Sequence, residues 1–174
     1  MFRRTFLILV MTVVLVAMGA CSDGGFDDGS NADVLLQVAT VDVPPITATL
    51  DPLNPGGCTF TVTEALATLD NVPKTEFEVV TPANDILITR LTITYAWDDG
   101  VVTPPFVTSP RITIPTDSTG TVTFLAIPLD DLINAAVPRD GHSAEMTIVF
   151  DGVTESSDNV QALSGAALIV NSCQ

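Results

Sequence analysis

The chain has 174 residues and a formal net charge of −15, with six Lys and Arg against 21 Asp and Glu. Nucleic acid is excluded as a partner, because binding it requires clustered positive charge. Binding to anionic lipid through a polybasic segment is excluded for the same reason. The length fits one domain of ordinary size with enough residues to bury a core.

The first predicted element is a signal peptide over residues 1–20. Two arginines precede an apolar run over residues 6–18, which is shorter than the roughly 20 residues needed to cross a bilayer as a helix. Two small residues then lead directly to Cys21. The segment resembles the signal and lipobox of bacterial lipoproteins, in which this cysteine is lipidated and becomes the new N-terminus. An ordinary secretory signal with a chance cysteine is the alternative.

The resemblance implies a location for the protein in the cell. Cys21 would carry fatty acyl chains such as palmitate, and two or three such chains hold a protein firmly at a bilayer. Ser22, directly after the cysteine, favours passage to the outer membrane. We therefore expect the membrane as a partner through the lipid on Cys21, with the domain facing the periplasm or the cell surface.

Residues 21–32 are predicted to be a flexible, acidic tether. The stretch after Cys21 reads SDGGFDDGSNA, which offers too little apolar surface to order itself. Its aspartates lack the spacing of a calcium-binding loop, so we expect no metal site there.

Residues 33–174 alternate apolar and polar side chains with the period of β-strands, and Pro and Gly pairs separate the runs. The predicted strands are 34–39, 46–50, 58–63, 77–80, 86–97, 111–114, 121–127, 144–150 and 166–170, the last beginning as early as Val160 in an alternative reading. Only residues 129–137 read as a helix, which Pro138 ends. This pattern predicts an all-β fold, an antiparallel β-sandwich with one short helix.

The clearest strand, residues 86–97, changes parity along its length. Leu91, Ile93 and the two aromatics that follow share one face, whereas Ile86 and Ile88 fall on the opposite parity. We therefore expect a bulge or bend near Thr89 or Arg90, or a strand that changes sheets.

Cys58 and Cys173 are the only cysteines left once Cys21 carries lipid, and export places them in an oxidising compartment. We expect a disulfide between them, which would stabilise the fold by about 4 to 5 kcal/mol because it closes a long loop. Two free, buried thiols are the alternative.

The sequence NDILITRLTITYAWDDG, the proline-rich TPPF and the late strand AEMTIVFDG resemble an uncharacterised group of bacterial lipoproteins. The resemblance covers roughly residues 58–171. It implies an immunoglobulin-like or fibronectin-type-III-like domain and an envelope location, and it implies no activity.

Motifs for catalysis are missing from the sequence. His142 is the only histidine, and it lies in a predicted loop beside Ser143 without a nucleophile elbow. There is also no zinc, thiol-redox or nucleotide motif. We therefore predict that the protein is not an enzyme and has no catalytic residue, metal site or cofactor.

Two acidic pairs and one trio are the remaining candidates for chemistry. Asp98 with Asp99, and Asp130 with Asp131, are adjacent residues whose side chains are expected to diverge, so neither pair suits sugar hydrolysis. The trio Asp151, Glu155 and Asp158 is too sparse for a calcium cage.

Three aromatic side chains could contact a ligand. Tyr95 and Trp97 are assigned to the core because they share the parity of the buried strand positions. Phe106, in a proline-rich loop, is the candidate for an exposed contact.

The sequence thus predicts a lipid-anchored envelope protein that acts as a non-enzymatic structural or interaction module, with an envelope protein or a glycan as its partner. The alternative is a surface domain that binds carbohydrate or divalent cations. An envelope hydrolase with acids brought together by folding is a third hypothesis.

Overall fold

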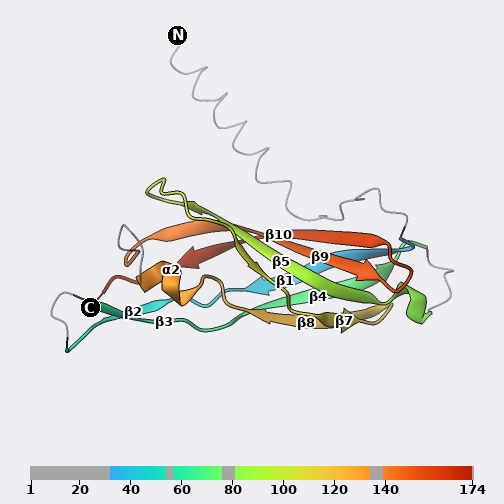
Figure 1. The fold of residues 1–174 in the computed structure, drawn as a ribbon, viewed down its shortest axis with the longest axis horizontal. Helices are drawn as coiled ribbons and strands as arrows, with labels where there is room; N and C mark the ends of the chain where they lie inside the picture. The colour runs from blue at the N-terminus through green and yellow to red at the C-terminus, as the bar shows by residue number, and fades with distance from the viewer. Residues whose placement is uncertain (1–31, 54–56, 76–80, 134–138, 174) are drawn as a thin grey trace, which may run out of the picture.

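The computed structural model describes residues 32–53, 57–75, 81–133 and 139–173, which form mostly antiparallel strands (Figure 1). Its elements are β1 (Val34–Asp42), β2 (Thr47–Leu50), β3 (Cys58–Thr61), β4 (Ala65–Pro73), η1 (Pro82–Asn84), β5 (Ile86–Trp97), β6 (Phe106–Thr108), β7 (Ile112–Ile114), β8 (Ser118–Phe124), α2 (Leu129–Ile133), β9 (Ser143–Thr154) and β10 (Asn159–Ile169). The signal peptide, Cys21, the tether up to residue 31, the strand predicted at 77–80 and the end of the predicted helix lie outside the described residues.

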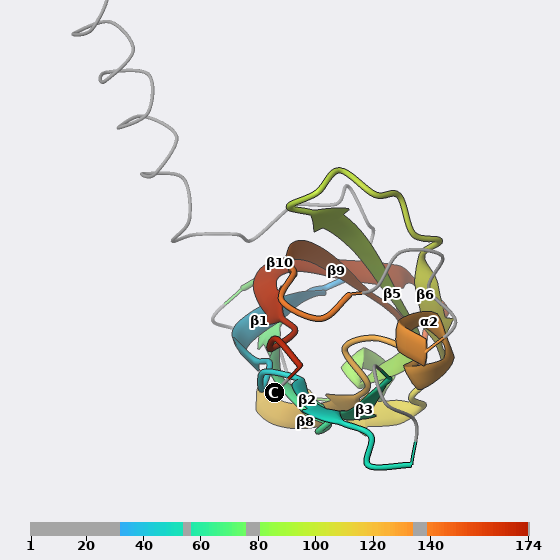
Figure 2. The ribbon, with the colours of Figure 1, turned by 90° about the vertical axis from the view of Figure 1, so that its left-hand side faces the viewer.

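Two antiparallel sheets pack face to face, which confirms the predicted sandwich. One has the order β1-β4-β8, and the other has the order β10-β9-β5-β6, with β7 also paired to β5. Seen end-on, the β10-β9-β5-β6 layer lies opposite β8 across the interior (Figure 2). These orders correspond to the A-B-E and G-F-C strand pairings of an immunoglobulin-type sandwich.

The core lies between the two sheets and follows from the alternation of each strand. On β9, Ala144, Met146 and Ile148 are buried while the residues between them face outward. The rings of Phe124 on β8 and Phe150 on β9 meet edge to face, with their centroids 6.4 Å apart. This contact joins the two layers.

The bulge predicted in β5 is present. The register with β9 shifts between Ile88 and Arg90, and the extra residue is Thr89. Ile86, Ile88, Leu91 and Ile93 are all fully buried, because the extra residue returns both halves of the strand to the same face. The same shift turns Arg90 to the outer face of the sheet.

The sequence pattern missed two strands. β4 is the central strand of its sheet, but its Ala-rich and Asp- and Asn-containing sequence has a low strand propensity. β6 is a short edge strand flanked by prolines, which are typical of edge positions. Phe106 begins β6 and packs partly buried against the core, so its assignment to an exposed loop contact is wrong.

The disulfide between Cys58 and Cys173 is present, with their Cα atoms 6.1 Å apart. It joins β3 to the segment after β10, rather than crossing between the two main sheets as in antibody domains. Ile46 adds a parallel bridge to Val170, in which the Ile46 N–H donates to the Ile169 carbonyl at 2.8 Å. Together these links fix the β2-β3 hairpin to the C-terminal end of the chain.

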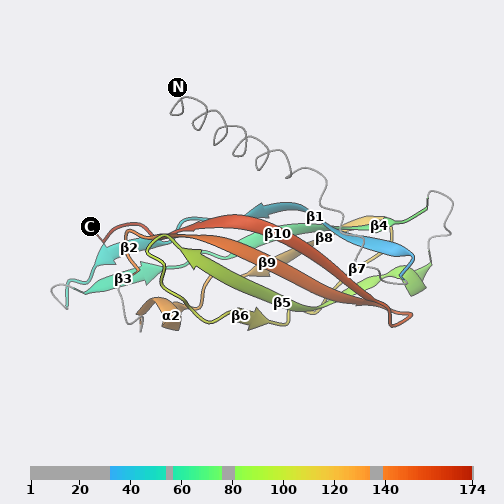
Figure 3. The same cartoon turned by 90° about the horizontal axis from the view of Figure 1, so that it is seen from above.

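The sandwich has two distinct ends. β1 begins at the end that carries η1, and the β2-β3 hairpin and α2 lie at the other (Figure 3). The 12 residues of β5 span most of this distance, about 40 Å at 3.3 Å per residue. Ala32, which the sequence analysis placed in the tether, is only 3% exposed and belongs to the core cluster. The chain preceding the domain therefore joins it at the η1 end.

Candidate functional site

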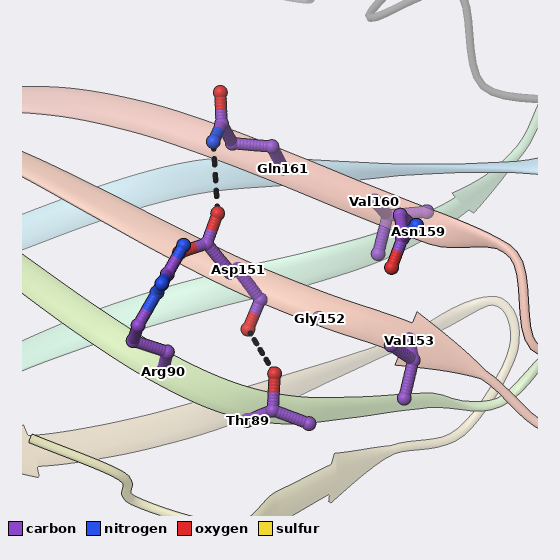
Figure 4. A pocket seen from close by; sticks show the side chains of 8 residues that line it. All are labelled: Thr89, Arg90, Asp151, Gly152, Val153, Asn159, Val160 and Gln161. Atoms are coloured by element: carbon purple, nitrogen blue, oxygen red, sulfur yellow. Dashed lines mark hydrogen bonds and ion pairs between the residues drawn. The ribbon is translucent and has the colours of Figure 1, made fainter.

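Polar side chains gather in a hollow on the outer face of the β10-β9-β5 sheet (Figure 4). The hollow has a volume of about 560 Å³ and is open to solvent. Arg90 comes from β5, Asp151 from β9 and Gln161 from β10, and the strand register places the three in one row across the sheet. The β5 bulge therefore positions this row, because it sets Arg90 opposite Asp151.

Asp151 is the centre of the row. Its Oδ2 accepts a hydrogen bond from Nε of Arg90 at 2.7 Å, and its Oδ1 accepts one from Nε2 of Gln161 at 2.8 Å. Thr89 Oγ1 donates to the Asp151 carbonyl at 3.3 Å. Figure 4 shows Arg90 and Gln161 approaching Asp151 from opposite sides. The carboxylate is thus held from both neighbouring strands.

Several groups in the hollow remain open to solvent. The Arg90 side chain is 60% exposed, and no described residue accepts a hydrogen bond from its two terminal nitrogens. The carbonyl oxygen of the Gln161 side chain and the amide of Asn159 have no hydrogen-bond partner among the described residues either. The hollow therefore offers both donors and acceptors to a bound molecule.

A second polar cluster lies at the end of β5, in the turn that follows Trp97. Asp98 Oδ1 accepts from Nδ1 of His142 at 2.8 Å, and Oδ2 accepts from the backbone N–H of Ser143 at 2.9 Å and from its hydroxyl at 3.1 Å. The hydrogen bond from His142, followed by that from the Ser143 backbone, lowers the pKa of Asp98 to about 2. The hydrogen bonds of this carboxylate link the turn after β5 to the start of β9.

Asp99 makes a different set of contacts. Its Oδ1 accepts the Val101 N–H at 3.1 Å, as expected for a turn residue before Gly100, and its Oδ2 lies 3.2 Å from the buried guanidinium of Arg139. The Val101 hydrogen bond, and secondly Arg139, lower the pKa of Asp99. The Arg139 guanidinium also lies 5.0 Å from the centre of the Trp97 ring.

The two aromatic residues of β5 belong to the core, as predicted. Trp97 is 5% exposed, its indole N–H donates to Thr103 Oγ1 at 3.1 Å, and its ring stacks on that of Tyr95. Tyr95 is partly buried, and its hydroxyl donates to the Ala126 carbonyl at 2.8 Å. Burial, and secondly the charge of Asp131, raises the pKa of Tyr95, so the hydroxyl stays a donor.

The cluster around His142 does not have the geometry of a serine triad. In a triad the serine hydroxyl donates to the histidine, which in turn donates to the aspartate. Here the Ser143 hydroxyl donates directly to Asp98 instead. These three residues therefore form a structural hydrogen-bond cluster rather than a proton relay to a nucleophile.

The side chains of Asp98 and Asp99 were expected to diverge, and that expectation is wrong. Ligand atoms of Asp98, Asp99 and His142 lie within 4.8 Å of one another, because β5 ends at Trp97 and strand alternation does not extend into the turn. A cation there would compete with the hydrogen bonds of Asp98 and face the positive charge of Arg139.

The other predicted candidates lie apart from this cluster. Asp151 faces the hollow, and within the described residues it forms no metal-ligand group with Glu155 and Asp158. Asp130 and Asp131 lie in the first turn of α2. The sequence pattern did not indicate the row formed by Arg90, Asp151 and Gln161. The parity change near Arg90 was the available signal, because a bulge at this point turns the Arg90 side chain to the outer face.

No known protein-family profile matches the chain, and no curated protein matches it. In the part of the chain that the structure describes, no helix combines the length and the apolar composition needed to span a membrane. The fold and the geometry of these two clusters are thus the basis for assigning a function.

Proposed function

We propose that the chain is a lipid-anchored cell-envelope protein whose β-sandwich serves as a non-enzymatic interaction module. The observation that carries this proposal is the outer face of the β10-β9-β5-β6 sheet. A row of uncharged side chains crosses all four strands in register: Val107, Thr92, Val149 and Leu163. The hollow around Asp151 lies beside this row.

This sheet face has an unusual charge balance for so acidic a protein. Its outward strand positions include Arg90, Asp151 and Glu145 as charged residues, whereas the whole chain carries −15. Arg90 and Asp151 are paired with each other. Such a face can approach a partner with little charge repulsion, and the exposed Leu163 and Val107 provide apolar contact area.

The sequence supports an anchor at the end of the sandwich where the domain begins. Cys21 precedes Ala32 by about ten residues, and a tether of this composition, as predicted from the sequence, would reach roughly 20 Å. An outer-membrane lipid on Cys21 would hold the η1 end of the sandwich near the bilayer and leave the outer sheet face accessible along its length.

The anchor is tested by replacing Cys21 with Ser in cells fed a labelled fatty acid. The expected result is that Cys21→Ser takes up no label and either remains uncleaved or leaves the detergent phase on partitioning. Cys173→Ser is the matched control, since it also removes one cysteine but should still be labelled. Labelling of the Cys21→Ser protein would reject the anchor.

The contact face is tested by photo-crosslinking in intact cells. A benzophenone amino acid at position 163, on the proposed face, should give a covalent product with an envelope component. The same amino acid at the exposed position 121, on the outer face of the other sheet, is the control and should give none. Equal products at both positions, or no product at 163, would reject this face.

A further inference from the structure

The hollow around Asp151 presents hydrogen-bond donors and acceptors side by side. The terminal nitrogens of Arg90 can only donate, the side-chain oxygen of Gln161 can only accept, and the Asn159 amide can do both. Each hydroxyl group of a ligand can both donate and accept a hydrogen bond. Neighbouring hydroxyls on one molecule would use this mixed set fully.

The charges of the hollow disfavour both kinds of ion. An anion would meet the carboxylate of Asp151 close to the Arg90 guanidinium, within a chain that carries −15. A metal cation would meet the guanidinium itself, and both oxygens of Asp151 already accept hydrogen bonds. A neutral molecule avoids both penalties.

The shape and rigidity of the hollow suit a sugar ring. Its volume of about 560 Å³ lies within the range of small-molecule sites. Val153 contributes an apolar wall against which the C–H groups of a sugar ring can pack. Arg90, Asp151 and Gln161 come from three hydrogen-bonded strands and already contact one another, so little ordering is needed on binding.

We infer that this hollow binds a neutral saccharide through neighbouring hydroxyl groups, with Arg90 donating to one hydroxyl and the side-chain oxygen of Gln161 accepting from another. The inference rests on the proposed function, because it names the class of partner that the sheet face contacts. Asp151 is a positioning residue, since it orients both side chains through its two oxygens.

The test is titration of the full chain, kept in a detergent without a sugar headgroup, with neutral tetrasaccharides of glucose and of N-acetylglucosamine and with acidic tetragalacturonate. Saturable binding of a neutral tetrasaccharide at millimolar concentration is expected, and Arg90→Ala and Gln161→Ala should each weaken it at least tenfold. Gln37→Ala, a glutamine on the outer face of the other sheet, is the matched control and should bind as the unmodified chain does.

Two outcomes would overturn the inference: no binding of any neutral tetrasaccharide, whether or not tetragalacturonate binds, or binding that neither variant weakens. Melting temperatures of both variants, measured alongside, separate loss of binding from loss of folding. An Asp151→Asn variant should weaken binding less than Arg90→Ala, because an amide can still accept from Arg90. The crosslinking experiment at position 163 is independent of these titrations. If no saccharide binds, the proposed function as an interaction module is therefore still tested by that experiment.

Discussion

Asp98 shows how one exposed side chain can organise a turn. Its two oxygens accept three hydrogen bonds from His142 and Ser143, although the carboxylate itself is partly open to water. Because an ionised carboxylate only accepts, Nδ1 of His142 carries the proton in this contact. The sequence placed His142 in an exposed loop, and only the fold could bring it to Asp98, which is 44 residues away in the chain.

Replacing Asp98 by Asn should lower the midpoint of thermal unfolding at neutral pH. A carboxyl whose pKa is lower in the folded state stabilises the fold above its ordinary pKa of 3.8, and this contribution is lost as the pH falls through about 2. The midpoints of the wild type and Asp98→Asn, followed by circular dichroism, should therefore converge as the pH is lowered toward 2. A gap between the two midpoints that stays constant over this pH range would refute the explanation.

At the scale of the elements, strand alternation determined what could be predicted. The parity change in residues 86–97 located the β5 bulge correctly, because Ile86 and Ile88 before it and the apolar positions from Leu91 onward must reach one core. β4 was missed since its buried positions include Ala65, Ala67 and the polar Asn71, which do not resemble a strand pattern. Asn71 is tolerated there because its side chain donates to the carbonyls of Asn84 and Ile114.

The packing of β9 against β5 and of β10 against β9 predicts different effects for two glycines. A Cβ at Gly152 would lie 2.7 Å from Ile86 Cγ2 and 3.2 Å from the Leu87 carbonyl oxygen, whereas a Cβ at Gly165 would meet only the Met146 carbonyl at 3.7 Å. Gly152→Ala should lower the free energy of unfolding by about 1 to 3 kcal/mol through overpacking. Gly165→Ala should leave it unchanged or raise it by about 0.5 kcal/mol, because alanine loses less backbone entropy than glycine in a strand. Urea unfolding measures both, and an equal effect of the two substitutions would contradict the predicted packing.

At the scale of the whole molecule, the disulfide and the charge act on the entire fold. The sequence predicted the pairing of Cys58 with Cys173 by elimination, but the position of the bond at the end of the sandwich depends on the β2-β3 hairpin packing beside the C-terminal segment. That packing joins segments over 100 residues apart, so no local pattern could indicate it.

Reduction of this disulfide should destabilise the domain strongly. The bond joins residues 115 positions apart, and the chain-entropy model gives about 4 to 5 kcal/mol for a loop of this length. The expected results are no free thiol at Cys58 or Cys173 on alkylation of the unreduced, denatured protein, and a lower urea midpoint after reduction. Alkylation of both cysteines without a reductant would show that the bond does not form in solution.

The charge of −15 predicts how the molecule responds to cations. Calcium prefers six or more oxygen ligands, but the metal-type group found among the described residues comprises only Asp98, Asp99 and His142, with Arg139 beside it. Added cations should therefore stabilise the fold only by screening repulsion among the acidic residues. We expect the melting temperature to rise equally with calcium, magnesium or sodium chloride at matched ionic strength, and to do so in Asp98→Asn as in the wild type. A saturable rise in melting temperature at micromolar calcium that magnesium does not reproduce would instead demonstrate a specific calcium site and favour cation binding as the function. Loss of that rise in Asp98→Asn would place the site in the turn after β5.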